Sequence, residues 1–289
     1  MKFTKMQGIG NDYVYINGFE EKFADHPGMS VKVSDRHFGI GSDGLIIINP
    51  SDKADFEMEM YNADGSRSEM CGNGIRCVGK FVYDKGLTDK TEITVDTLAG
   101  VKKLKLFTEN GRVKSVTVDM GEPILKAEDI PVNIPGISGD TEKVVSVPIE
   151  VKGKEYKITC VSMGNPHGVV FVPEDPGDLN LEALGPDFEN HAYFPNRVNT
   201  EFIYVKDRKN LIMRVWERGS GETFACGTGA CASLVAAVLN GLSDREVDIK
   251  LLGGTLHIKW DEDDGHVYMT GPAETVFEGD LEESLVTRL

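Results

Sequence analysis

The feature that most constrains this chain is a weak internal duplication, in which the second half repeats the first at a nearly constant offset. Cys-Gly-Asn-Gly at Cys71 to Gly74 matches Cys-Gly-Thr-Gly at Cys226 to Gly229, an offset of 226 − 71 = 155. The pair Gly10-Asn11 matches Gly164-Asn165, with 165 − 11 = 154. Ordered anchors at one offset indicate two copies of one structural unit.

Both copies predict the same order of elements. Each begins with a Gly-Asn turn and an apolar strand, continues with an alternating strand, and then has Cys-Gly-x-Gly and one long helix. A hairpin follows, with its turn at Asn110-Gly111 in the first copy and at Asp264-Gly265 in the second. The expected strands are residues 13–16, 56–61, 102–107 and 112–118, answered by residues 169–172, 211–216, 256–260 and 266–269.

The two expected helices, residues 73–85 and 228–240, determine the predicted architecture. The second is apolar almost all round, which is typical of a buried helix. Strands before and after a buried helix predict an α+β fold of two pseudo-symmetric lobes, each a curved β-sheet wrapped around a central α-helix. We expect residues 1–125 to form the first lobe, residues 126–273 the second, and residues 274–289 to pack back on the first. The proline-bearing stretch 121–135 is the expected linker.

Size and charge narrow the possible partners. A chain of 289 residues has room for two cores. Its 31 basic and 47 acidic residues give a net charge of -16, which repels nucleic acid and anionic lipid. No apolar run reaches the roughly 20 residues that cross a bilayer, and the N-terminal residues lack the pattern of a signal peptide. We therefore expect a cytoplasmic protein with a small-molecule substrate and neither a nucleic-acid nor a membrane partner. Monomer and homodimer both stay open.

The five cysteines are too few and too oddly numbered for a secreted disulfide framework, so we expect reduced thiols. Cys77, Cys160 and Cys231 lie inside expected helices or a strand, where a cysteine is usually a small buried apolar residue. Cys71 and Cys226 differ from them, because both stand at a helix start, precede a glycine and occupy the same place in the repeat.

A cysteine at a helix start is suited to proton transfer. The unpaired N–H groups and the helix dipole lower the pKa of a thiol there and can also hold a carboxylate. Inversion of a carbon centre needs a base on one face and an acid on the other. Cys71 and Cys226 are therefore the predicted catalytic pair, one on each side of a substrate α-carbon, titrating as a coupled pair.

Other interpretations of these residues are weaker. A zinc site from Cys71, Cys77, Cys226 and Cys231 would have C-x5-C and C-x4-C spacings, and the first does not fit a zinc knuckle. We predict no metal. A disulfide between Cys71 and Cys226 would be an oxidised, inactive form of the same site.

The glycine-rich segments and most of the histidines are better explained by structural roles than by functional ones. Neither Gly8-Ile9-Gly10 nor Gly219-Ser220-Gly221 completes a nucleotide-binding motif. A single histidine such as His191 is more often structural than catalytic. His167 stands out because it follows Gly164-Asn165, the counterpart of Gly10-Asn11.

Taken in order, these segments resemble the diaminopimelate epimerase family along essentially the whole chain. Any one segment is weak evidence, whereas the ordered set is specific. The matching segments are residues 8–13 (Gly-Ile-Gly-Asn-Asp-Tyr), 61–66 (Tyr-Asn-Ala-Asp-Gly-Ser), 70–77 (Met-Cys-Gly-Asn-Gly-Ile-Arg-Cys), 164–167 (Gly-Asn-Pro-His), 197–199 (Arg-Val-Asn), 216–219 (Trp-Glu-Arg-Gly) and 225–232 (Ala-Cys-Gly-Thr-Gly-Ala-Cys-Ala).

The resemblance implies an isomerase that interconverts LL- and meso-diaminopimelate for lysine and peptidoglycan precursors, without pyridoxal phosphate, metal or any other cofactor. It also implies the same two-lobed fold. By position, Cys71 and Cys226 would be acid and base, and His167 and Glu217 would adjust their proton affinity. The substrate-binding set would be Asn11, Gly72, Asn73, Gly227 and Thr228 at the reacting end and Asn62, Asn165, Asn199 and Arg218 at the non-reacting end, with Glu217 also a member of the set.

The sequence departs from the family pattern at one position, and two other functions compete with the one that the resemblance implies. Gly44 stands where many relatives have Gln, so the contact of that side chain is missing or replaced. A proline or hydroxyproline racemase is the rival with the same chemistry, but such enzymes usually have His where this chain has Asn73, and they need no grip like that of Arg218 on a distal carboxylate. A non-catalytic amino-acid-binding protein is the other rival, and it would have no need of two thiols.

Overall fold

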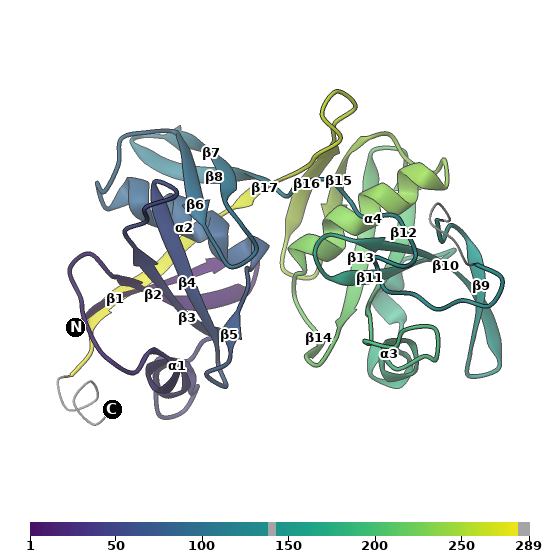
Figure 1. The fold of residues 1–289 in the computed structure, drawn as a ribbon, viewed down its shortest axis with the longest axis horizontal. Helices are drawn as coiled ribbons and strands as arrows, with labels where there is room; N and C mark the ends of the chain where they lie inside the picture. The colour runs from purple at the N-terminus through teal and green to yellow at the C-terminus, as the bar shows by residue number, and fades with distance from the viewer. Residues whose placement is uncertain (138–142, 283–289) are drawn as a thin grey trace. The chain divides into compact units, whose positions relative to one another are not determined.

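The computed structural model describes residues 1–137 and 143–282, which form two compact units (Figure 1). Unit 1 comprises Met1–Val118 and the described residues from Thr270 onward, and unit 2 is Asp119–Met269. We expected the domain boundaries after residues 125 and 273, and these boundaries stay a prediction. The last part of the expected returning segment, residues 283–289, lies outside the described residues.

Unit 1 is a mixed sheet with two helices. Its strands pair in the order β18, β1, β2, β3, β4, β6, β7 and β8, with the short β5 beside the end of β4. The bounds are β1 (Lys2–Gly8), β2 (Asn11–Asn17), α1 (His26–Ser34), β3 (Gly44–Asn49), β4 (Phe56–Asn62), β5 (Arg67–Ser68), α2 (Gly72–Asp84), β6 (Glu92–Asp96), β7 (Lys102–Glu109), β8 (Arg112–Asp119) and β18 (Glu274–Asp280).

Unit 2 follows the same plan. Its strands pair in the order β9, β10, β11, β12, β13, β15 and β16, and β17 leads the chain back toward unit 1. The bounds are β9 (Val147–Val151), β10 (Lys154–Ser162), β11 (Pro166–Phe171), η1 (Pro176–Asp178), α3 (Leu181–Glu189), β12 (Asn199–Asp207), β13 (Asn210–Glu217), β14 (Gly221–Glu222), α4 (Gly227–Leu239), β15 (Glu246–Lys250), β16 (Thr255–Trp260) and β17 (Val267–Pro272).

Strand register confirms the internal duplication. In the parallel pair β2–β3, Val14 lies opposite Leu45, and in β11–β12, Gly168 lies opposite Thr200. The partners are displaced by 168 − 14 = 154 and 200 − 45 = 155 residues. The pairs β3–β4, β4–β6 and β6–β7 keep the same relation to β12–β13, β13–β15 and β15–β16. Register is set by which face of a strand is buried, so the match reflects a shared core pattern.

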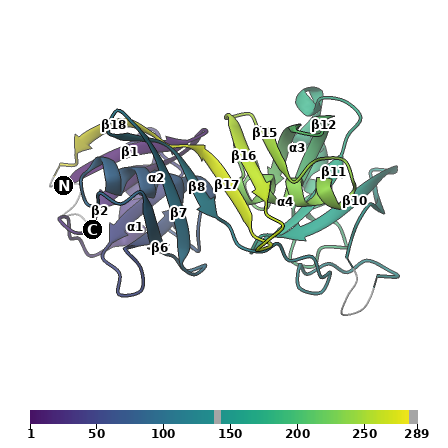
Figure 2. The ribbon, with the colours of Figure 1, turned by 90° about the horizontal axis from the view of Figure 1, so that it is seen from above.

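The two central helices confirm the predicted α+β architecture. Each has 13 residues and begins directly after a cysteine N-cap, one residue earlier than expected. Helix α2 packs on β1, β2 and β7, and α4 packs on β10, β11, β12 and β16 (Figure 2). Almost every residue of both is buried, which agrees with a helix that is enclosed by its sheet. In the described ranges, no helix combines the length and the apolar character that crossing a bilayer would require.

Burial of α2 includes two basic side chains, each with polar partners. Arg76 is 0% exposed and donates to the Gly72 carbonyl and to the Asn73 side chain. Lys80 pairs with Asp84 four residues on, at 2.7 Å. Buried charges are tolerated when hydrogen bonds satisfy them, so α2 remains an interior helix despite its basic residues.

The expected linker 121–135 is wrong as a description of this segment. Ala127, Ile130 and Ile134 are buried in the hydrophobic core of unit 2, and Ile124 forms a β-bridge with Ser162. The prolines prevent a regular strand, but the apolar residues between them still supply core contacts. The segment is therefore an irregular part of unit 2.

Helix α3 was not predicted, and it positions part of the candidate site. Its N-cap Asn180 accepts a hydrogen bond from the Ala183 N–H, and Leu181 and Phe188 are buried. At Gly185 the helix lies against the Trp216 ring so closely that an added Cβ would stand 2.1 Å from the ring. Helix α3 is thus held tightly against the C-terminal end of β13.

The expected hairpin turn at Asn110-Gly111 is confirmed, since both residues have positive φ, 52° and 73°, between β7 and β8. In the second copy, the Asp261 N–H donates to the His266 carbonyl, and Gly265 has a φ of 75°.

Gly44 is required by close packing of the backbone. An added Cβ would lie 2.1 Å from the Tyr61 carbonyl oxygen on the neighbouring strand and 2.8 Å from the Tyr13 ring. The strand therefore has no space for a Gln side chain at this position with its present backbone.

We expect Gly44→Ala to destabilise the protein by about 1–3 kcal/mol, because the clash is with main chain that cannot rotate away. Urea unfolding followed by circular dichroism measures this. Gly177→Ala is the control, since its added carbon would meet only an Asp175 oxygen at 3.3 Å. Equal unfolding midpoints for the two variants would contradict the packing argument.

Candidate active site

Cys71 is the N-cap of α2, with extended backbone angles φ −127° and ψ 119°. Its sulfur accepts a hydrogen bond from the Gly74 N–H at 3.3 Å, and its thiol donates to Oδ1 of Asn11 at 3.0 Å. The side chain is partly exposed. The sulfur thus lies at the positive end of the helix, within reach of its first N–H groups.

The amide of Asn11 is oriented by an acid. Its Nδ2 donates to Asp43 at 2.7 Å, so its oxygen points to the Cys71 sulfur. Asp43 also accepts from the Asp12 N–H, and Arg36 donates to both Asp12 and Asp43 at 3.0 Å. Burial raises the pKa of Asp43, while the hydrogen bond from the Asp12 N–H opposes that rise. This network fixes Asn11 as an acceptor beside the thiol.

The other predicted residues of unit 1 precede and follow Cys71 in the chain. Asn73 is 2% exposed and its side-chain oxygen accepts from Arg76 at 2.9 Å, so any substrate contact by Asn73 would come from its main chain. Asn62, at the end of β4, donates to Ser66 at 2.9 Å. Gly72 is the first residue of α2.

Cys226 occupies the same place in unit 2. It caps α4 with φ −119° and ψ 109°, and its sulfur accepts from the Gly229 N–H at 3.4 Å. The Thr228 hydroxyl lies 3.5 Å from the sulfur, and Gly227 is the first residue of the helix. Unlike Cys71, the Cys226 side chain is only 5% exposed.

The environment of Cys226 overturns the prediction that a helix start lowers its pKa. Burial raises the pKa of Cys226 well above the usual range, and the nearby carboxylates of Glu217 and Glu201 raise it further. Hydrogen bonds from Thr228 and Gly229 lower it, but burial and the two acids outweigh them. Cys226 therefore holds its proton firmly.

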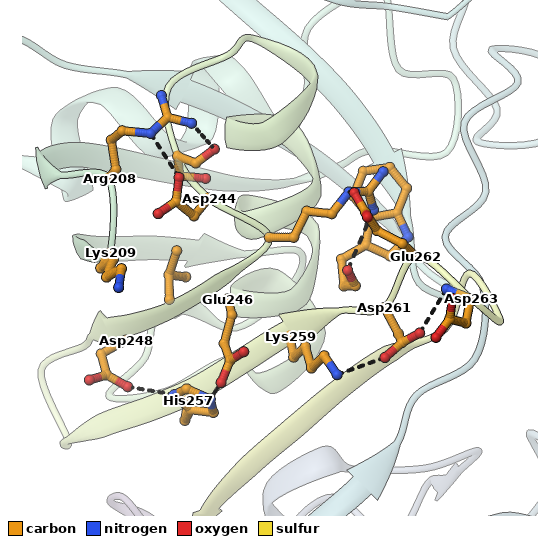
Figure 3. A pocket seen from close by; sticks show the side chains of 14 residues that line it. Arg208, Lys209, Asp244, Glu246, Asp248, His257, Lys259, Asp261, Glu262 and Asp263 are labelled. Atoms are coloured by element: carbon orange, nitrogen blue, oxygen red, sulfur yellow. Dashed lines mark hydrogen bonds and ion pairs between the residues drawn. The ribbon is translucent and has the colours of Figure 1, made fainter.

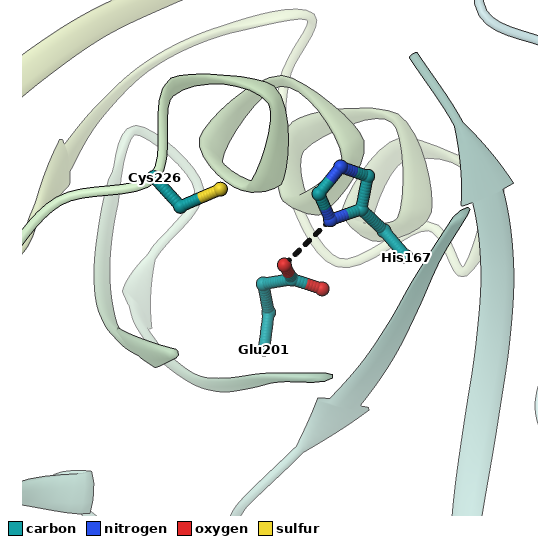
Figure 4. A group of neighbouring side chains, drawn as sticks. All are labelled: His167, Glu201 and Cys226. Atoms are coloured by element: carbon teal, nitrogen blue, oxygen red, sulfur yellow. Dashed lines mark hydrogen bonds and ion pairs between the residues drawn. The ribbon is translucent and has the colours of Figure 1, made fainter. Parts of the chain in front are cut away.

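His167 and Glu201 form a buried pair beside Cys226 (Figure 4). Both side chains are 0% exposed, and His167 Nδ1 lies 2.7 Å from Oε1 of Glu201. The other ring nitrogen lies 3.0 Å from Oδ1 of Asn165. In the part of the chain that the structure describes, Oε2 of Glu201 has no hydrogen-bond partner.

The geometry of this cluster does not suit a metal site. Ligand-capable atoms of His167, Glu201 and Cys226 lie within 4.8 Å of one another. Both ring nitrogens of His167 are already engaged, one with Glu201 and one with Asn165, so a metal would have to break a short buried hydrogen bond.

Two residues of the predicted distal set, Asn199 and Arg218, meet at the turn after β13. Oδ1 of Asn199 accepts from the Arg218 N–H at 2.8 Å, and its Nδ2 donates to the Pro166 carbonyl at 3.1 Å. The Arg218 guanidinium donates to the Asn196 carbonyl at 3.0 Å. Burial raises the pKa of Glu217, which accepts from Thr223 at 2.5 Å.

Several residues of the site were missed by the sequence interpretation. Tyr13 lies close enough to Cys71 that burial and the thiolate charge both raise its pKa. Glu201 and Glu189 are buried acids of unit 2. A signal existed for Glu201, because it is a charged residue directly before the apolar run 202–205 and its repeat partner, at 201 − 155 = 46, is Ile46.

The remaining cysteines belong to the core, as predicted. Cys77, Cys160 and Cys231 are at most 2% exposed, and burial raises the pKa of Cys77 to about 11. All five cysteines lie within the described ranges, and no disulfide joins them.

A charged hollow of about 870 Å³ on unit 2 is separate from these residues (Figure 3). Its side chains pair mainly with one another. His257 lies between Asp248 and Glu246 at 2.8 and 3.0 Å, and Arg208 donates to Asp244 at 2.8 Å. None of the predicted site residues lines it.

Structural comparison supports the fold. A hydroxyproline epimerase from Agrobacterium vitis superposes with a TM-score of 0.69 at 14% identity, covering 97% of this chain and 90% of that one. A phenazine biosynthesis protein of the PhzF family from Bacillus anthracis gives 0.69 at 15% identity, covering 98% and 99%. At such low identity the likeness shows a shared fold.

Sequence comparison is far closer. The family model described as diaminopimelate epimerase matches residues 3–126 and 159–276. A diaminopimelate epimerase from Acetivibrio thermocellus is 59% identical over 282 residues, covering 98% of this chain and 99% of the relative. One from Methanococcus maripaludis is 56% identical, covering 98% and 100%. With its two cysteine-capped helices in equivalent places, this chain belongs to the diaminopimelate epimerase family.

Proposed function

We propose that this protein interconverts LL- and meso-diaminopimelate by proton transfer between two thiols, Cys71 and Cys226. The observation that carries the proposal is that both sulfurs cap equivalent helices, each accepting the N–H of the glycine three residues on. One structural unit, used twice, supplies two proton carriers of the same kind. The proposal requires both sulfurs to reach the same α-carbon from opposite faces.

The two thiols differ in their surroundings, and this gives them different resting roles. Cys226 retains its proton because burial and two carboxylates raise its pKa, so it is the resting acid. Cys71 is the more exposed of the two and would serve as the base once the proton that its thiol shares with Asn11 has left the sulfur. In one direction the Cys71 thiolate removes the α-proton while the Cys226 thiol delivers a proton to the other face. The reverse reaction exchanges the roles, so no proton is gained or lost overall.

The helix starts also hold the substrate carboxylate. N–H groups of Gly72 and Asn73, and of Gly227 and Thr228, belong to the first turns of α2 and α4. Such groups favour an anion and would stabilise the charge that develops on the carboxylate as the α-proton leaves. The reaction would then need neither pyridoxal phosphate nor a metal ion.

The non-reacting end of the substrate is assigned to the distal set. Arg218 would bind the distal carboxylate, with Asn62, Asn165 and Asn199 around the distal amino group. His167 and Glu217 stay in the predicted role of adjusting the proton affinity of Cys226, and both lie near it. We also propose a cytoplasmic location, in keeping with the substrate of this route.

Replacing either catalytic thiol should remove epimerisation. We expect Cys71→Ala and Cys226→Ala each to lower kcat by about 10²- to 10⁴-fold, the usual contribution of a general acid or base. The measurement is deuterium uptake at the α-carbon of LL-diaminopimelate in D₂O, with proline as the substrate control.

Cys231→Ala is the matched protein control, since Cys231 is buried in the helix that Cys226 caps. It should leave turnover close to that of the unmodified protein. Full activity in either catalytic variant, with an intact fold by circular dichroism, would end the two-thiol scheme.

Removing the distal clamp should act mainly on binding. We expect Arg218→Ala to raise KM for diaminopimelate about 10- to 100-fold, since a charged hydrogen-bonded pair is worth roughly 1.5–3 kcal/mol. Steady-state kinetics and thermal melts are run together.

Arg245→Ala is the control, because Arg245 stacks on Trp260 at 4.2 Å, on the charged hollow and away from the proposed site. An unchanged KM in Arg218→Ala would remove Arg218 from the substrate site.

A further inference from the structure

Glu189, the last residue of α3, is a buried acid with three hydrogen-bond donors and no assigned role. It is 6% exposed. Its Oε2 accepts from Trp216 Nε1 at 2.8 Å, and its Oε1 accepts from the Gly219 N–H and from Arg197 Nη1, each at 2.9 Å. Two of these donors flank Glu217 and Arg218 in the chain, so one carboxylate ties both sides of that turn.

The same part of the chain holds Arg218 directly. The Arg218 N–H donates to Asn199 at 2.8 Å, and its guanidinium donates to the Asn196 carbonyl at 3.0 Å. Glu189, Asn196 and Asn199 all belong to residues 189–199, which run from the end of α3 into β12. The position of Arg218 is therefore set at its main chain and at its side chain by one short segment.

A charged acid is physically suited to this task. A carboxylate offers two acceptor oxygens and makes stronger hydrogen bonds than a neutral amide. A buried charge is costly unless it is well satisfied, and here two N–H groups and a guanidinium satisfy it. Arg197 donates from the surface, with its side chain 52% exposed, and has a positive φ of 59°. The charge of Glu189 is thus compensated without using Arg218, whose guanidinium is left for another anion.

We infer that Glu189 is a positioning residue for distal-end recognition, which fixes the turn that presents the Arg218 guanidinium to the carboxylate at the non-reacting end of the substrate. This inference rests on the proposed function, because it needs Arg218 to bind that carboxylate. A positioning role for Glu189 predicts a difference between ligands, which a purely structural role does not predict. Loss of Glu189 should matter for ligands that have a distal carboxylate and not for those that lack one.

The test uses Glu189→Gln in the full-length protein. Gln keeps the size of the side chain but lacks the charge and offers one acceptor oxygen. We expect KM for LL-diaminopimelate to rise about 10-fold, the effect of weakening charged hydrogen bonds, while kcat changes less than about threefold. The inhibition constant of L-lysine, which is diaminopimelate without the distal carboxylate, should not change.

Asp187→Asn is the matched control, because Asp187 lies on the same helix and forms an exposed ion pair with Lys152 at 3.2 Å. It should behave as the unmodified protein. Unchanged KM in Glu189→Gln would overturn the inference. An equal loss of affinity for diaminopimelate and lysine would also overturn it, since that result indicates general damage.

A second variant covers the case in which Glu189→Gln does not fold. Arg197→Ala removes the exposed donor and leaves the buried ones, and we expect a KM increase of about threefold. An unchanged KM there would then count against the inference. The unmodified protein separates the two proposals: if it does not epimerise diaminopimelate, the proposed function fails first, whereas activity with an unaltered Glu189→Gln variant refutes only the positioning role.

Discussion

The hydrogen bond from a glycine N–H to a cysteine sulfur at the start of α2 and of α4 is the interaction on which the rest of the structure depends. It places a proton carrier at the positive end of a buried helix, where backbone N–H groups can also bind a carboxylate. The surrounding sheet encloses each helix and keeps its first turn fixed. The distances, 3.3 and 3.4 Å, are nearly the same in both units, so the duplication preserves this detail as well as the fold.

Within that common frame, the two units differ in chemistry. An added Cβ on Gly74 would meet Ile46, Met58 and Cys71, and one on Gly229 would meet Glu201, Met213 and Cys226. These partners correspond one to one at an offset of 155, since 201 − 46, 213 − 58 and 226 − 71 all equal 155. The only change of character is apolar Ile46 to acidic Glu201. Burial is the main cause of the raised pKa of Cys226, and the carboxylates of Glu217 and Glu201 raise it further.

Much of the fold could be predicted from the sequence because each half of the chain can be compared with the other. The order of elements along the chain, the two central helices and the hairpin turn at Asn110-Gly111 follow from periodicity and from turn residues seen twice. The segment 121–135 was misjudged because its prolines indicate an irregular chain, and irregular backbone can still bury Ile130 and Ile134. Helices α1 and α3 are counterparts in the repeat, since 181 − 26 = 155, but neither segment contains one of the compared sequence anchors, so both were missed.

The candidate site was predicted less completely than the fold, for a physical reason. Residues such as Cys71 and Arg218 occur in recognisable segments, whereas the acids that orient them come from distant strands and helices. Asp43 reaches Asn11 across 43 − 11 = 32 positions, and Glu189 reaches Gly219 across 30. The raised pKa of Cys226 was missed as well, since it depends on burial that spacing alone does not reveal.

Placing Glu201 and His167 in the interior of unit 2 has a thermodynamic consequence for the protein as a whole. An apolar side chain such as Ile46 serves the same packing position in unit 1 without any desolvation of charge. Oε2 of Glu201, which has no hydrogen-bond partner among the described residues, makes the interior of unit 2 less favourable than an aliphatic one would be. A substitution at Glu201 that made the protein more stable would therefore be expected to lower its turnover. The conflict between stability and activity lies in unit 2.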